Sequence, residues 1–197
     1  LQTMGTYLTY KPGSWNLDGA FYYQTGKNKD AEKVSALMGS VQAAYAFDKT
    51  WGVVASFDYL SGDKGNGDKF KAFDPLYGTH HKFYGSMDYF YANLFVNGYA
   101  PGLMDSRFRA SDKVDMELNY HYFTTAVELP DLNKSLGSEV DYQINLSVMK
   151  DVKLSAGYSF MRGTKTMDVV KGGNHKSWQD WGWVSLNINP KVFFTKW

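Results

Sequence analysis

The chain has 197 residues, a length that suits one domain, and carries 21 Lys and Arg against 20 Asp and Glu. A net charge of +1 gives no reason to expect nucleic acid as a partner, and the absence of cysteine excludes disulfides and thiolate metal sites. Mean hydropathy is -0.42, and no apolar run approaches the ~20 residues of a membrane-spanning helix, which excludes a helical membrane protein.

Apolar and polar residues alternate with a period of two in segments of about ten residues, the pattern expected of strands with two different faces. In chain order this alternation predicts nine strands, at about 2–11, 15–25, 34–47, 51–61, 103–112, 115–127, 139–149, 152–162 and from 178 to the end of the chain. The apolar stripes, with residues such as Leu146 and Tyr158, need an apolar environment, which lipid supplies.

The connections between these segments alternate in length. Short ones fall at 12–14, 48–50, 111–114 and 150–151, and long ones at 26–33, 62–102, 128–138 and 163–176. Outer-membrane barrels have short periplasmic turns and long outer loops. A strand at 87–96 would reverse this order, and its residues alternate poorly, so we expect one long outer loop at about 62–102.

The aromatic content of 17% also favours a membrane barrel, because Tyr and Trp collect at membrane–water interfaces. Opposite each apolar stripe stand Asn, Gln, Ser, Asp and Gly, which suit a wet lumen. In lipid every backbone polar group must be bonded internally, so the sheet has to close. The predicted fold is therefore an all-β, antiparallel transmembrane β-barrel formed by residues 1–197 as one barrel region. Since nine strands is an odd number, we expect these residues to be the C-terminal part of a longer protein.

Several segments resemble the alginate-export porin family as it occurs in Bacteroidetes. The resemblance lies in Phe73–Phe90, including His80-His81-Lys82-Phe83, in Leu103–Phe108, in Tyr120–Phe123 and in the aromatic ending Pro190–Trp197. It implies a barrel of about eighteen strands, of which this chain would supply the second half. It also implies export of an anionic polysaccharide in some members, although substrate does not transfer with fold.

Charged and amide side chains on the polar faces are the candidate pore-lining residues: Asp105, Arg107, Arg109, Glu117, Asn119, His121, Asp141, Gln143 and Lys153. Arg107 and Arg109 could attract carboxylates at a constriction, because each presents a planar fork of donors. Alternatively, they form a charge ladder with neighbouring acidic residues that fills the wall.

The long loop could fold into the lumen as a constriction. Its candidate residues are Phe73, Asp74, Tyr77, His80, His81, Phe83 and Asp88. The aromatic members could pack the interior or stack on sugar rings.

We expect no metal site, cofactor or catalytic activity. His80 and His81 are adjacent and point apart in an extended segment, and residues 63–68 lack the closing Glu of a calcium loop. No Gly-x-Ser-x-Gly element is present for an outer-membrane hydrolase.

The sequence therefore predicts a porin in the bacterial outer membrane that passes hydrophilic solutes, anionic saccharides among them, by diffusion. The alternative is a structural or docking barrel of an outer-membrane complex with a plugged lumen. Expected partners are membrane lipids and lipopolysaccharide, small-molecule or oligosaccharide solutes, and other outer-membrane proteins.

Overall fold

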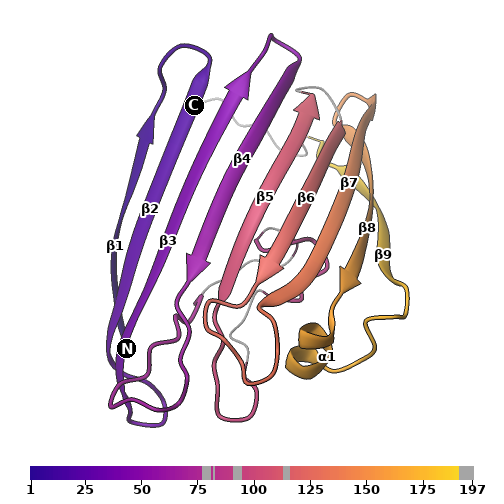
Figure 1. Ribbon diagram of the computed structural model, residues 1–197. Helices are drawn as coiled ribbons and strands as arrows, with labels where there is room; N and C mark the ends of the chain where they lie inside the picture. The colour runs from indigo at the N-terminus through magenta and orange to yellow at the C-terminus, as the bar shows by residue number, and fades with distance from the viewer. Residues whose placement is uncertain (77–80, 82, 91–94, 113–115, 191–197) are drawn as a thin grey trace.

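The computed structural model describes residues 1–76, 81, 83–90, 95–112 and 116–190. They form one antiparallel sheet in which nine strands pair in the order in which they occur in the sequence (Figure 1). The strands are β1 (Gln2–Tyr10), β2 (Trp15–Lys27), β3 (Lys33–Ala46), β4 (Trp51–Leu60), β5 (Leu103–Asp112), β6 (Met116–Thr124), β7 (Ser135–Met149), β8 (Val152–Gly163) and β9 (Gln179–Ile188). The all-β prediction is confirmed, since each strand overlaps a predicted segment.

The pairing keeps the apolar stripes of all nine strands on one face. For example, Tyr10 pairs with Leu17, Leu17 with Ala43 and Ala43 with Ala55. The same row continues through Phe108 to Tyr120. We call this the outer face. The alternate residues form the inner face, toward which the long connection between β4 and β5 is folded.

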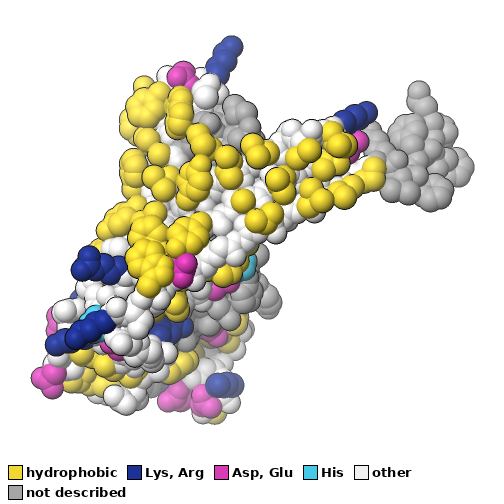
Figure 2. Space-filling model, turned by 90° about the vertical axis from the view of Figure 1, so that its right-hand side faces the viewer, with side chains coloured by type: hydrophobic (Ala, Val, Ile, Leu, Met, Phe, Trp, Pro, Cys, Tyr) yellow, Lys and Arg dark blue, Asp and Glu magenta, His cyan; other side chains and the backbone are white. Residues whose placement is uncertain are grey.

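The outer face is covered by no second layer of described residues. Large hydrophobic side chains stay exposed on it, among them Leu8, Val41 and Val184, which is 74% exposed. Figure 2, which looks onto the side where β7 to β9 lie, shows hydrophobic side chains over its upper part and charged ones at the upper tips and around the lower end.

The long connections lie together at one end of the sheet and the short turns lie at the other (Figure 1). β4 pairs directly with β5, so residues 61–102 are one connection, and their described part contains isolated bridges and no strand. This agrees with the expected single loop at 62–102.

Two strand boundaries and one connection differ from the prediction. β7 begins at Ser135, inside the segment expected to be loop, and β9 ends at Ile188 rather than passing Pro190, whose nitrogen has no hydrogen to donate to a ladder. The connection after β8 contains a helix, α1 (Lys165–Lys171), which the sequence did not predict. Thr164 begins it as N-cap, accepting a hydrogen bond from the Met167 N–H. No helix among the described residues has the length and apolar character to cross a bilayer.

The buried core lies at the loop end, on the inner face. It joins side chains from the sheet to those of the long connections, including Leu60, Phe90, Phe123, Leu136 and Met167. Beyond this core the inner face is polar.

Candidate functional site

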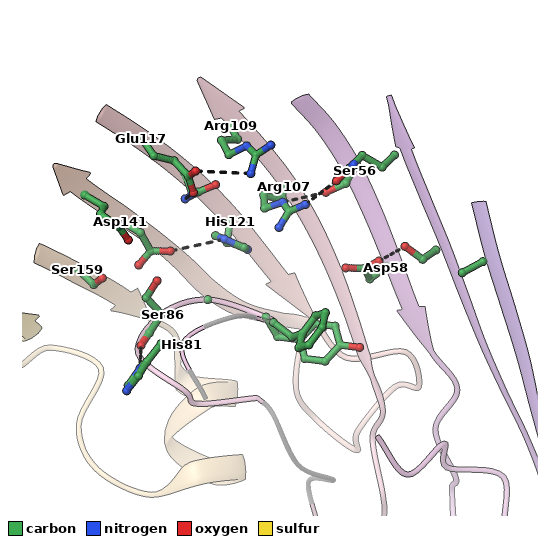
Figure 3. Close-up of a pocket in the computed structure, with 18 of the residues that line it drawn as sticks. Ser56, Asp58, His81, Ser86, Arg107, Arg109, Glu117, His121, Asp141 and Ser159 are labelled. Carbon is green, nitrogen blue, oxygen red and sulfur yellow. Dashed lines mark hydrogen bonds and ion pairs between the residues drawn. The ribbon is translucent and has the colours of Figure 1, made fainter. Parts of the chain in front are cut away.

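A cavity of about 540 Å³ lies between the inner face of the sheet and the loop 62–102. Its lining comes from strands throughout the sheet, from Tyr7 on β1 to Trp183 on β9, and from residues 81 and 83–86 of the loop. Figure 3 shows the charged members projecting from neighbouring strands toward this space. The strand alternation places them there, because every second residue of each strand faces inward.

Arg107 and Arg109 line the sheet side of the cavity, which we call the arginine wall. Neutral groups hold the Arg107 guanidinium. Its Nε donates to Ser56 Oγ at 3.0 Å, and its Nη2 donates to Gln42 Oε1 at 2.9 Å. Ser56 pairs with Arg107 across β4 and β5, and Gln42 pairs with Ser56 across β3 and β4. The guanidinium therefore lies along the wall, with its charge unmatched by a carboxylate in these contacts.

Arg109 forms the charge-ladder contact that was one of the two alternatives. Its Nη1 lies 3.5 Å from Glu117 Oε2, and both side chains are about one-third exposed to the cavity. Asn119 donates to the other oxygen of Glu117 at 2.7 Å. An ion pair this exposed stabilises the fold by little.

His121 lines the cavity and lies between two carboxylates. Its Nδ1 donates to Asp105 at 2.9 Å, and its Nε2 lies 3.6 Å from Asp141 (Figure 3). All three side chains are less than 8% exposed. A carboxylate buried this deeply requires a polar partner, and the His121 imidazole lies beside both Asp105 and Asp141.

The other pore-lining candidates lie in different parts of the inner face. Gln143 lines the cavity, whereas Lys153 is exposed near the short-turn end and lies outside the cavity lining. Asp105 is 2% exposed and faces His121, so it is covered rather than presented to the cavity.

The described loop candidates lie against the inner face of the sheet. Phe73 is buried in the core, and Phe83 is 43% exposed and lines the cavity. His81 stacks on Trp181 of β9 with ring centroids 4.4 Å apart, and its Nδ1 lies 3.1 Å from Asp88 Oδ2. Tyr77 and His80 lie outside the described residues.

Asp74 of this loop contacts the sheet through its backbone. Its N–H donates to Gln24 Oε1, and its carbonyl accepts from Gln24 Nε2. The sequence did not single out Gln24, nor Glu139, which accepts a hydrogen bond from the Met87 N–H. Both lie on the inner face, but nothing in the sequence indicates which loop residue each would meet.

Tyr84, another aromatic residue of the long loop, also lines the cavity. Burial raises the pKa of its phenol, and the carboxylates of Asp58 and Asp105 add to the effect. The phenol is therefore neutral at physiological pH, and it lines the same cavity as Arg107 and Arg109.

Among the residues that the structure describes, no group of three or more His, Asp or Glu side chains is arranged to hold a metal ion. No protein-family model matches the chain, and comparison with curated proteins gives no significant match. Functional inference therefore rests on the geometry.

Proposed function

We propose that this chain forms part of the wall of a bacterial outer-membrane channel through which hydrophilic solutes diffuse. The supporting observation is the division of the sheet into two faces: nine strands in register present an exposed apolar face on one side and a polar cavity on the other. A β-barrel in lipid requires this arrangement, because its outside meets hydrocarbon and its inside meets water. The role is transport, with no catalytic step.

Aromatic side chains at the two ends of the outer face support a membrane position. At the turn end, Trp15 contacts Tyr45 at 4.8 Å between ring centroids, and Tyr45 contacts Phe47 at 5.2 Å. At the loop end, Phe160 stacks on Trp178 at 5.4 Å. Such rings gather at the two membrane–water interfaces of outer-membrane barrels.

The distance between the two ends of the outer face can be compared with the thickness of a bilayer. Trp15 and Tyr23 are eight residues apart on β2, or about 27 Å along an antiparallel strand. A tilt of roughly 40° reduces that to about 20 Å along the membrane normal. The apolar band of a transmembrane barrel is about 25 Å tall, so the distance from Trp15 to Tyr23 covers most of that height.

Closure of the barrel belongs to the proposal. In the described sheet β1 pairs with β2 alone and β9 with β8 alone, and both edge strands run in the same direction because nine is odd. An all-antiparallel ring therefore needs an odd number of further strands between them. A barrel of about eighteen strands satisfies this, and we extend the proposal to the alginate-export porin resemblance on that ground.

The loop on the inner face favours a second candidate as well, a structural or docking barrel with a plugged lumen. Loop residues 81 and 83–86 occupy the space beside the arginine wall. A loop in this position could leave a narrowed pore or fill it.

Planar-bilayer recordings decide between the two candidates. The full natural polypeptide that carries these residues, purified in detergent and inserted into a lipid bilayer, is expected to show steady single-channel current in salt solution. A protein that inserts and stays silent over the whole voltage range would refute the channel and support the docking barrel.

A further inference from the structure

The loop 62–102 is held to the inner face at two polar anchors that lie five strands apart. The first is Gln24 on β2, which is 1% exposed. Its Nε2 donates to the Asp74 carbonyl at 2.7 Å, and its Oε1 accepts from the Asp74 N–H at 2.8 Å. The amide therefore bonds both backbone groups of one loop residue, as a neighbouring strand would.

The second anchor is Glu139 on β7, whose side chain is fully buried. Its Oε1 accepts a hydrogen bond from the backbone N–H of Met87 at 2.8 Å. Gly85 has a φ of +87°, and a Cβ there would lie 2.5 Å from a Glu139 oxygen. Only glycine combines that conformation with so close an approach.

The base of the loop is fixed independently of these anchors. Asp63 and Ala100 exchange two backbone hydrogen bonds, and the Asp63 carboxylate accepts from the N–H groups of Gly65 and Lys71. Phe90 packs on Phe123 with ring centroids 4.5 Å apart. Loss of an anchor would thus release the tip of the loop without detaching its base.

The two anchored loop residues, Asp74 and Met87, contact strands on opposite sides of the inner face, β2 and β7. Phe83, Tyr84 and Ser86, which lie between them in the sequence, line the cavity opposite Arg107 and Arg109. The position of these three residues therefore sets the free width beside the arginine wall.

We infer that Gln24 and Glu139 are the residues that determine the size limit of the channel, by clamping the loop tip across the lumen. This inference rests on the proposed channel function. It assigns selectivity by size to two buried wall residues that do not meet the solute.

The test compares anchor variants with matched controls in the full natural polypeptide. Glu139→Ala and Gln24→Ala remove an anchor, whereas Glu139→Gln keeps an oxygen that accepts from Met87. Glu128→Ala and Gln2→Ala make the same changes at exposed positions outside the clamp. Each protein is recorded in planar bilayers with neutral polyethylene glycols of graded mass, which report the width of the pore.

We expect Glu139→Ala and Gln24→Ala each to raise conductance about twofold and to admit a larger polyethylene glycol. The His81–Trp181 stack remains in both, so the release is partial, and the double variant should show a larger increase. Glu139→Gln and the two controls should behave like the wild type. Wild-type width in both alanine variants, or a widening in Glu139→Gln equal to that in Glu139→Ala, overturns the inference.

Limited trypsin digestion in detergent gives a readout that needs no conduction. A released loop tip should be cut at least several-fold faster in the alanine variants, while the melting of the sheet, followed by far-ultraviolet circular dichroism, stays close to that of the wild type. If the protein conducts nothing but the variants are cut faster, the clamp stands and the channel function fails. If the protein conducts and neither width nor cleavage changes, the clamp fails and the channel stands.

Discussion

His121 shows how the polar wall is stabilised residue by residue. Its ring contacts Asp105 on one side and Asp141 on the other, and all three side chains are buried. Removing the shared partner of two buried carboxylates leaves both without compensation, which is among the larger costs that a single substitution can produce. The wall therefore depends on this one imidazole more than on the exposed pair of Arg109 and Glu117.

We expect His121→Leu to lower the free energy of unfolding by about 3 kcal/mol. Urea unfolding in detergent, followed by tryptophan fluorescence, measures the change. The control is Tyr122→Leu, the next residue along β6, whose side chain lies on the outer face and is 40% exposed. An equal loss in both variants would mean that the contact with the two carboxylates stabilises nothing.

Tyr84 provides a prediction about pH. Because the pKa of its phenol is raised above the ordinary value of about 10, the folded protein holds this proton where the unfolded chain has released it. The stabilisation is complete below pH ~10 and is lost as pH rises through the raised pKa. Absorbance titration at 295 nm should show one phenol fewer at the highest pH values in Tyr84→Phe. If the absorbance difference between the wild type and Tyr84→Phe appears near pH 10, the Tyr84 phenol is not buried.

At the scale of elements, β8 and β9 pack closely because a glycine on one strand lies beneath an aromatic ring on the other. The Trp183 indole on β9 lies over Gly157 on β8, where a Cβ would meet its Nε1 at 2.3 Å. Gly157 and Trp183 are cross-strand partners. The ring can take this position only while its partner has no side chain.

Gly157→Ala should therefore force the indole away and destabilise the protein by about 1–3 kcal/mol, the usual cost of overpacking. Gly39→Ala on β3 is the control, because nothing lies within 4 Å of a Cβ there. Thermal melting of both variants in detergent gives the comparison. If Gly39→Ala melts as low as Gly157→Ala, the general cost of replacing a strand glycine explains the loss and the indole contact does not.

The strands were predictable from sequence, whereas the short helix and the loop anchors were not. Period-two alternation is a local signal, and it appears in every strand. The helix Lys165–Lys171 has about two turns, too few for a helical period to stand out from a loop. Gln24 and Asp74 are 50 residues apart, and Glu139 and Met87 are 52 apart, so no local pattern connects them.

At the scale of the whole molecule, the same alternation predicted which face would hold the candidate site. Arg107, Arg109, Glu117, Asn119 and Gln143 do share one cavity, since the register carries their phase from strand to strand. The sequence could not show which charges would be covered. Asp105 is buried against His121, a contact that depends on the pairing of β5 with β6 and on the loop packed above them.

The assignment of the outer face to lipid gives opposite expectations in a membrane and in water. Val184 on β9 is 74% exposed on that face, and Ser185, its neighbour, belongs to the inner face. In a bilayer, Val184→Arg should cost about 2–4 kcal/mol and reduce the yield of folded protein in lipid vesicles, because the guanidinium is placed in hydrocarbon. Ser185→Arg should fold nearly as well as the wild type, because its side chain meets a wet lumen.

In a water-soluble protein the exposed Val184→Arg change would cost nothing. Folding yield in vesicles, read from the shift in gel mobility of unheated samples, separates the two cases. Equal yields for the two arginine variants would show that hydrocarbon does not cover the outer face and would remove the basis for a membrane channel.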